Sequence, residues 1–306
     1  MDTRKEIDGR AGGLMLLLCA LWGLQQVAIK LAAADIAPIL QIAIRSGIAA
    51  VLVATLMLVR RERLATDAWQ PGLLVGALFA LEYLFVGEGL RFTTASHMAI
   101  FLYTAPIFAA LGLHWKLPAE RLKPLQWGGI GLAFAGIIVS FASRGGPSGG
   151  DASTMWIGDL LGLAAGMAWA ATTLAIRFSS LAKTSATVTL LYQLLGAAVI
   201  LTPAAVALDQ AAIRPSAVAL GSLAFQAVVV SFLSFLAWFS LLRVYLASRL
   251  GVLSFMTPLF GIGFGVWILD EPLDLGFVAG ALLVLAGILL VSGHEWIQPS
   301  RRAAAA

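Results

Sequence analysis

Long apolar runs alternate with short polar connections along most of the chain. Ten of these runs approach the ~20 residues that a helix needs to cross the hydrocarbon core of a bilayer. They cover approximately residues 13–31, 36–59, 70–90, 95–117, 125–143, 157–179, 184–207, 217–242, 247–269 and 275–293. Most of the connections are too short to fold on their own. The pattern therefore predicts an all-α polytopic membrane protein, with ten transmembrane helices in a single membrane domain over residues 1–306.

The chain also repeats itself after about 151 residues. A stretch rich in Gly, Pro and Ser at 143–155 separates a first repeat, 13–143, from a second repeat, 157–293. Each repeat has five crossings, and because five is odd the second copy begins on the opposite face of the membrane. We therefore expect two inverted five-helix repeats, an arrangement typical of alternating-access transporters. The matching segments are 90–96 with 242–248, Pro106 with Pro258, Glu120 with Glu271, and 135–140 with 286–292.

Composition supports a membrane location, and charge predicts the orientation. Hydrophobic residues make up 60% of the chain and charged residues only 12%, against about 25% charged in soluble domains. With a cytoplasmic N-terminus, fifteen of the twenty Lys and Arg lie on the inner side and Arg45 lies within a span. This is the positive-inside distribution, and it predicts that the N- and C-termini are both cytoplasmic. The four external basic residues are Lys30, Arg91, Arg144 and Arg214.

Other functional classes find little support. A single cysteine, Cys19, excludes an internal disulfide, and the three histidines are too dispersed for a metal site. Basic clusters at loop ends are topology signals rather than a nucleic-acid surface. An intramembrane enzyme would need a nucleophile and a base at one depth. We expect no catalytic residues and no cofactor; the expected partners are a small-molecule substrate and the bilayer, for a monomer or weak dimer.

Two tryptophans lie near the middle of their spans rather than at the interface, where Trp is usually found. Trp22 in the 13–31 span and Trp169 in the 157–179 span are counterparts in the repeat. An indole N–H at mid-membrane depth needs a partner, so each ring packs inside the bundle or lines a cavity. We favour a position on the cavity wall, with ordinary helix packing as the alternative.

Glu82 is the most informative single residue, because a carboxylate near the bilayer centre is rare unless it faces protein or water. An ion pair with Arg45, at similar depth, is the structural interpretation. The functional one is that Glu82 faces the cavity and meets a substrate amine or a proton. Tyr83 and Tyr103 also lie at membrane depth, where a phenol belongs either to an aromatic binding wall or to the core.

Further positions are weaker candidates. His97 flanks the outer end of the 95–117 span, where a gate or interfacial role is favoured over a central one. Periodicity alone does not direct the remaining candidates toward a cavity. These are Tyr192, Gln193, Gln226 and Trp238.

Prolines and glycines predict how the helices bend and pack. Pro106 and Pro258 lie near the centres of equivalent spans, where each would kink its helix, either shaping the bundle or acting as a hinge. Glycines four residues apart allow helix backbones to approach closely in lipid. Such sets are Gly158, Gly162 and Gly166; Gly72 and Gly76; and Gly261 and Gly265.

The repeated features together resemble a known family. Segment 89–96, Pro106, Glu120 and the Gly136-containing span, repeated in the second half, resemble the drug/metabolite transporter superfamily, specifically its ten-helix EamA type. The resemblance covers essentially the whole chain. The family's repeated loop glutamate maps onto Glu120 and Glu271, which we interpret as structural residues that cap the following helix.

Within that superfamily, the chain looks like the YddG-like amino acid exporter branch. The residues that carry this likeness are Trp22, Trp169, Glu82 with Tyr83, His97 and Tyr103. The resemblance implies a uniporter-like or exchange-driven exporter of aromatic and other large neutral amino acids in a bacterial inner membrane.

The leading hypothesis is therefore an alternating-access exporter of amino acids or similar small amphipathic metabolites. Its central cavity would be largely apolar, with walls from Trp22, Trp169, Tyr83 and Tyr103. A proton-coupled multidrug or cation exporter of the same superfamily is the alternative, and its activity would depend on protonation of Glu82. A nucleotide-sugar or sugar-phosphate exchanger is disfavoured, because it needs several basic residues at cavity depth.

Overall fold

The computed structural model describes residues 8–62, 68–116, 121–142, 154–245, 250 and 253–292. Over these residues the chain is mainly helical, and Ile36 and Ile213 form an isolated antiparallel bridge. In chain order the elements are α1 (Gly9–Leu31), α2 (Pro38–Val59), α3 (Trp69–Phe92), α4 (Ala95–Leu102), α5 (Ala105–Lys116), α6 (Pro124–Ala142), α7 (Met155–Arg177), η2 (Ser180–Lys183), α8 (Ala186–Ala207), α9 (Ala217–Ala224), η3 (Phe225–Ser234), α10 (Phe235–Val244), α12 (Met256–Leu269) and α13 (Leu275–Ser292).

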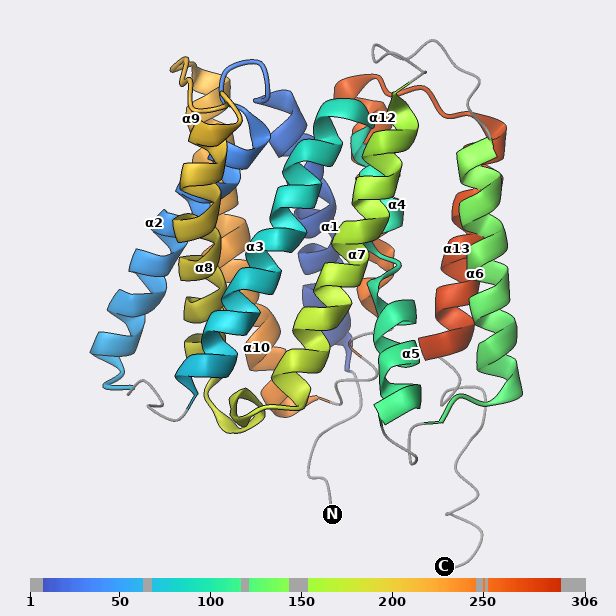
Figure 1. Cartoon of the computed structure of the whole chain (residues 1–306), viewed down its shortest axis with the longest axis horizontal. Helices are drawn as coiled ribbons and strands as arrows, with labels where there is room; N and C mark the ends of the chain where they lie inside the picture. Colours follow the sequence, from blue (N-terminus) through green and yellow to red (C-terminus); the bar gives the residue numbers. More distant parts are fainter. Residues whose placement is uncertain are drawn as a thin grey trace, which may run out of the picture.

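These helices confirm the ten spans expected from the apolar runs. In the part of the chain that the structure describes, seven helices are long and apolar enough to cross a membrane, counting α4 with α5 and α9 with η3 and the start of α10 as continuous spans. Three shorter apolar helices, within α6, α12 and α13, supply the others. The helices stand side by side as a single bundle (Figure 1).

The two halves of the chain run in opposite directions (Figure 1). α1 begins at one end of the bundle and α7, the first helix of the second half, begins at the other. We call the end of the bundle where α1 finishes the Leu31 end, and the end where it begins the Gly9 end. The start of α1 and the end of the last helix, α13, both lie at the Gly9 end (Figure 1), and an even number of crossings such as ten requires this.

The contact between α6 and α13 shows the inversion at atomic detail. A Cβ added to Gly136 would lie 2.6 Å from the carbonyl oxygen of Gly280, and one added to Gly129 would lie 2.8 Å from that of Gly287. In the repeat Gly136 corresponds to Gly287 and Gly129 to Gly280, so the two contacts exchange under a two-fold axis. The inverted-repeat prediction is therefore confirmed by the packing of equivalent helices against each other.

The glycine sets expected to bring helices together do so. A Cβ on Gly158 of α7 would lie 2.6 Å from the backbone nitrogen of Thr93, and one on Gly76 of α3 would lie 2.6 Å from the carbonyl oxygen of Tyr192 in α8. A Cβ on Gly261 of α12 would lie 2.8 Å from that of Ala99. Backbones this close gain dispersion contacts that compensate for the absence of a hydrophobic driving force within lipid.

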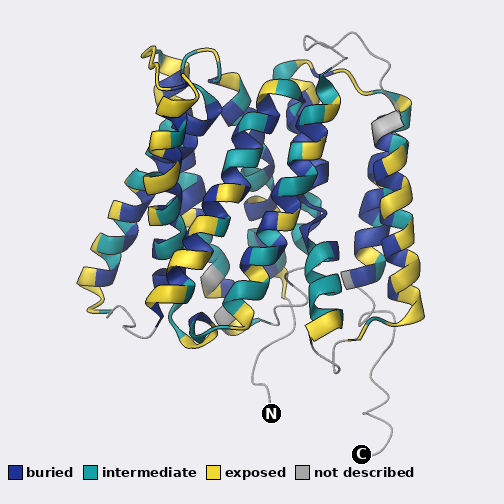
Figure 2. Ribbon diagram, in the orientation of Figure 1, coloured by how far each residue is buried: buried dark blue, intermediate teal, exposed yellow. Residues whose placement is uncertain are grey.

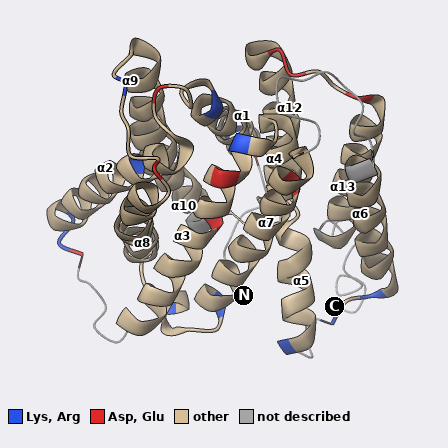
Figure 3. Ribbon diagram, turned by 45° about the horizontal axis from the view of Figure 1, so that its top comes forward, with Lys and Arg blue, Asp and Glu red and all other residues tan. Residues whose placement is uncertain are grey.

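The distribution of buried and exposed residues is that expected of a protein surrounded by lipid. Exposed positions lie on the outer faces and at the ends of the helices, and buried ones face inward (Figure 2). Large apolar side chains such as Val51 and Leu58 are 66% and 78% exposed, as expected of a surface that contacts acyl chains. Charged residues are concentrated near the helix ends, with few along the middle of the bundle (Figure 3).

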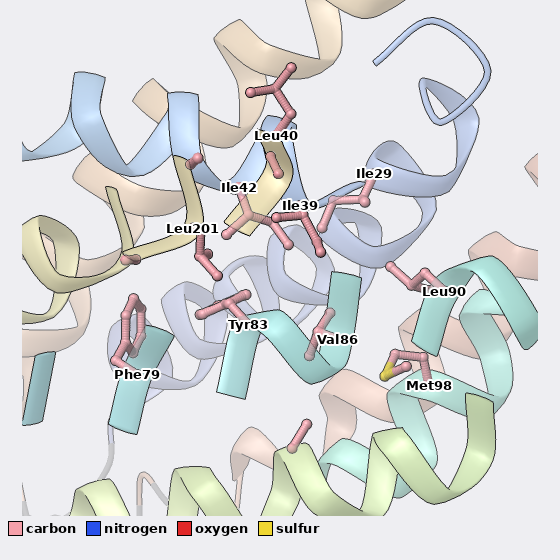
Figure 4. Close-up of a cluster of buried hydrophobic side chains, with 14 of the residues drawn as sticks. Ile29, Ile39, Leu40, Ile42, Phe79, Tyr83, Val86, Leu90, Met98 and Leu201 are labelled. Carbon is pink, nitrogen blue, oxygen red and sulfur yellow. The ribbon is translucent and has the colours of Figure 1, made fainter. Parts of the chain in front are cut away.

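The largest buried cluster joins the two halves. Figure 4 shows Ile39 and Ile42 of α2 and Tyr83 and Val86 of α3 beside Leu201 of α8. The same cluster extends to α1, to α4 and, through Trp169, to α7. Tyr83 is thus positioned on the inner face of α3, at the contact between first-half and second-half helices.

Two spans are broken where the sequence predicted kinks. α4 ends at Leu102 and α5 begins at Ala105, so Pro106 lies in the first turn of α5. Pro258 lies in the first turn of α12, after its N-cap Phe255. The first backbone N–H groups of a helix have no intrahelical partner, so proline removes nothing there. At both expected positions the span is interrupted, and each proline lies at the start of a new helical segment.

Candidate functional site

Four of the five predicted cavity residues lie together near the middle of the bundle. Glu82 and Tyr83 lie ten and nine residues before the end of α3 at Phe92, which places them ~15 Å below the Leu31 end. Tyr103 is the C-cap of α4, at the break in that span. Its hydroxyl is close enough to interact electrostatically with both Glu82 and Tyr83. The interruption of the helix therefore places the Tyr103 side chain within electrostatic range of Glu82.

Aromatic rings surround this position. The Tyr103 and Trp169 rings meet edge to face, with centroids 5.2 Å apart and an interplanar angle of 84°. The Tyr83 ring makes a similar contact with Phe79 at 4.8 Å and 64°. Edge-to-face geometry orients the positive edge of one ring toward the negative face of the other. First-half and second-half aromatics thus form one wall beside Glu82.

Arg45 of α2 extends toward the same place. Its guanidinium carbon lies 4.5 Å from the centroid of the Tyr83 ring, a cation–π contact, and its Nη1 is 3.5 Å from Gln226 Oε1. The side chains of Arg45 and Glu82 interact electrostatically, yet within the described part of the chain no ion pair joins them at 4.0 Å or less. Arg45 and Glu82 are therefore electrostatic neighbours, as the structural interpretation expects, but they do not form a closed salt bridge.

Gln226 belongs to a buried polar network that sequence reasoning found only in part. Its Nε2 donates to Gln41 Oε1 and to Ser222 Oγ, both at 2.8 Å. Gln41 in turn donates to the carbonyl oxygens of Ile29 and Ile36. The partners come from α2 and from the α9–η3 segment, 185 residues apart. The network fixes the Gln226 amide beside Arg45.

Trp22 lies in a different group from its repeat counterpart Trp169. Its Nε1 donates to Ser234 Oγ at 2.9 Å, and its ring contacts Trp238 edge to face at 5.7 Å. Ser234 is the last residue of η3, a π-helical stretch of ten residues in the middle of its span. Such stretches re-aim side chains and often mark functional positions. Trp22 and Trp238, predicted separately, therefore pair with each other.

His97 lies at the Leu31 end, in a polar cluster that joins the halves. Its Nδ1 is 3.0 Å from Asp159 Oδ1 on α7, and its ring stacks on Phe277 of α13 at 3.9 Å. Thr93 Oγ1 donates to the same Asp159 oxygen at 2.5 Å, and Lys30 donates to the Thr93 carbonyl oxygen. Asp159 was not predicted, although an acid just inside an apolar run at the depth of His97 was a usable signal.

Glu271 caps a helix, but not the one expected. Its carboxylate accepts hydrogen bonds from the backbone nitrogens of Ala95 and Ser96, at 2.6 and 3.0 Å, and from Ser96 Oγ at 2.6 Å. These groups form the N-terminus of α4 in the first half of the chain. The helix that follows Glu271, α13, is capped by Asp274 instead. Glu120, its repeat counterpart, lies outside the described residues.

Tyr192 and Gln193 lie away from this centre. The Tyr192 ring fills the space beside Gly72, where an added Cβ would approach it to 2.7 Å, and so it packs between α8 and α3. Gln193 is half-buried on α8.

Comparison with known proteins gives the family. Residues 10–142 and 156–293 each match the EamA-like transporter family. The uncharacterized transporter YvbV of Bacillus subtilis (strain 168) is 29% identical over 92% of this chain and 92% of its own. A probable amino-acid metabolite efflux pump of Salmonella typhimurium (strain LT2) is 27% identical over 91% and 93%.

A solved structure described only as a crystal structure of a protein superposes with a TM-score of 0.66 at 20% identity, over 95% of this chain and 99% of that one, and it supports the fold alone. The helical bundle and its antiparallel halves agree with the two family matches. The protein is a polytopic membrane transporter, and the chain belongs to the EamA-like transporter family of the drug/metabolite transporter superfamily.

Proposed function

We propose that this transporter exports amino acids, aromatic and other large neutral ones above all, or similar small amphipathic metabolites. The observation that carries the proposal is the meeting of Tyr83, Tyr103 and Trp169 around the buried Glu82 at mid-membrane depth. Aromatic rings accommodate an apolar or aromatic side chain, with each good ring contact contributing ~1 kcal/mol. The Salmonella relative, named as a probable amino-acid metabolite efflux pump, supports the same substrate class.

Alternating access would use the two repeats, 13–143 and 157–293, as its moving parts. Polar contacts that cross between them at the Leu31 end include His97 with Asp159 and the α4 N-terminus with Glu271. Opening at the Leu31 end requires these contacts to separate while the equivalent contacts at the Gly9 end close. Pro106 and Pro258 are proposed as hinges, because the helix breaks beside them allow one segment to turn without distorting the other.

The proposed orientation has the Gly9 end in the cytoplasm of a bacterial inner membrane, with both chain termini on that side, and the positive-inside distribution supports it. Cysteine accessibility tests this orientation. A single-cysteine series placed at Arg10, Arg60 and Arg214 should react with a membrane-impermeant maleimide from outside the cell only at position 214.

A transport assay tests the substrate class. Liposomes that contain the purified protein are expected to release labelled Phe, Trp, Met or Thr faster than protein-free liposomes. Trp169→Ala should slow release several-fold, because the ring contact with Tyr103 and with the substrate side chain is lost. Trp156→Ala, on the same helix but 42% exposed, is the matched control and should leave the rate unchanged. If none of the four amino acids is released faster, the proposed substrate class is wrong.

A proton-coupled exporter of cations is the second candidate, and one observation favours it. Glu82 is 5% exposed, and its Oε2 is a buried atom without a hydrogen-bond partner in the described residues. Acidic side chains within the membrane are typical of proton and ion pathways. This candidate predicts that an imposed pH gradient drives export of lipophilic cations and that Glu82→Gln abolishes the effect of the gradient. Unchanged pH dependence in Glu82→Gln would eliminate it.

A further inference from the structure

A basic and an acidic side chain lie buried near each other at the centre of the bundle without closing into an ion pair. The side chains of Arg45 and Glu82 are 2% and 5% exposed. Arg45 Nε and Glu82 Oε2 are both buried atoms without a hydrogen-bond partner in the described residues. Buried polar groups are nearly always hydrogen-bonded, and buried charges are paired or functional. Two unpartnered atoms of opposite character at one depth therefore indicate a ligand site.

Uncharged neighbours hold the guanidinium of Arg45 in place. Tyr83 supports the guanidinium of Arg45 through its ring face, and Gln226, itself fixed by Gln41, lies against Nη1. These neighbours are uncharged, so they orient the cation and leave its charge available. Glu82, the residue before Tyr83 on α3, interacts electrostatically with Arg45 and with Tyr103. The position of the Arg45 guanidinium is thus set before a ligand arrives.

A ligand that completes this arrangement must carry both charges itself. A free amine would pair with Glu82 and leave Arg45 unsatisfied, whereas a free carboxylate would do the reverse. An α-amino acid carries an ammonium and a carboxylate on one carbon, so it satisfies both atoms and keeps the net charge of the site unchanged. Its side chain would then meet the edge-to-face pair of Tyr103 and Trp169.

We infer that Arg45 binds the carboxylate and Glu82 the ammonium group of a zwitterionic amino acid. This inference rests on the proposed function, and it specifies which chemical groups of the substrate the site recognises. Selection acts on the shared backbone of the substrate, whereas the aromatic wall tolerates many side chains. Such a site accepts a broad range of amino acids yet rejects the corresponding amines, acids and esters.

Binding competition on the purified protein in lipid nanodiscs tests this assignment. Labelled phenylalanine is displaced by unlabelled phenylalanine, by its methyl ester, which lacks the carboxylate, and by N-acetylphenylalanine, which lacks the ammonium. For the wild type we expect each analogue to compete at least about tenfold more weakly than phenylalanine, since a hydrogen-bonded charge lost from a buried site has an effect of this size.

The variants should give a crossed pattern. Arg45→Gln should lower phenylalanine affinity about tenfold or more and remove the discrimination against the methyl ester, while the discrimination against N-acetylphenylalanine remains. Glu82→Gln should do the opposite. General damage to the fold lowers the binding of all three compounds together, so it does not produce this crossing. Arg91→Gln, which removes a half-exposed charge paired with Glu88 at the end of α3, is the matched control and should change neither ratio.

Failure of this inference is distinct from failure of the proposed function. If the wild type releases labelled amino acids from liposomes but binds phenylalanine and its two analogues equally well, the charge assignment is overturned and amino acid export stands. The charge assignment is also overturned if each variant loses affinity for all three compounds in equal proportion while it remains monodisperse. If the wild type neither binds nor releases Phe, Trp, Met or Thr, the proposed function itself falls.

Discussion

Replacing Glu271 with alanine is expected to destabilise the transporter by about 3 kcal/mol or more. Its carboxylate, 7% exposed, accepts three hydrogen bonds from the N-terminus of α4, two from backbone nitrogens and one from Ser96 Oγ. Alanine leaves three buried donors without a partner, and each orphaned group costs about 1–3 kcal/mol. The negative charge also complements the positive end of the α4 dipole. Unfolding titrations of the detergent-solubilised protein, followed by tryptophan fluorescence, measure the loss.

Asp274→Ala is the matched control, three residues along the same loop. Asp274 caps its own helix, α13, by accepting from the backbone nitrogens of Gly276 and Phe277 at 3.0 and 3.3 Å. It is only partly buried, so water replaces the lost acceptor and the cost should be about 1 kcal/mol. Equal losses for the two variants would contradict the view that Glu271 joins the second half of the chain to α4.

The helices and their inversion could be predicted because the bilayer imposes them. Backbone groups within lipid must be paired inside each segment, so a 20-residue apolar run has one structural outcome. An odd number of crossings then fixes the relative direction of the repeats. The breaks beside Pro106 and Pro258 were located but described as kinks, because sequence alone does not show whether the helix continues beyond a proline.

The residues of the candidate site were predicted only from their depth in the membrane. Glu82, Tyr83, Tyr103 and Trp169 converge because all four lie at the middle of spans that pack at the centre of the bundle. Depth did not separate Trp22 from this group, since its partner Ser234 depends on the π-helical stretch in a span 212 residues away.

The partner of Gln226 was also beyond sequence reasoning, because two glutamines in different spans give no signal of mutual contact. The direction in which Glu271 caps was missed for the same reason, since the N-terminus of α4 is distant in the chain. Residue type and depth thus identified which side chains are unusual, whereas the identity of their partners depended on tertiary packing.

Gly136→Ala is expected to destabilise the contact between α6 and α13 by about 1–3 kcal/mol, although alanine normally stabilises a helix. The added Cβ would lie 2.6 Å from the carbonyl oxygen of Gly280 and 2.7 Å from the backbone nitrogen of Val284. Both are backbone atoms, so no side-chain rotation relieves the overlap and the two helices must move apart. The apparent unfolding temperature in detergent, measured by tryptophan fluorescence, should fall accordingly.

Gly131→Ala on the same helix gives the control, because a Cβ there meets nothing within 4 Å. It should be neutral or stabilise the protein by up to about 1 kcal/mol, the intrinsic preference of a helix for alanine over glycine. Gly287 is the repeat counterpart of Gly136 and also meets backbone atoms of the opposite helix, so Gly287→Ala should be destabilising in a similar way. If Gly136→Ala and Gly131→Ala shift the unfolding temperature equally, close backbone packing of α6 on α13 does not hold the two repeats together. The other helix contacts between the repeats must then supply that stability.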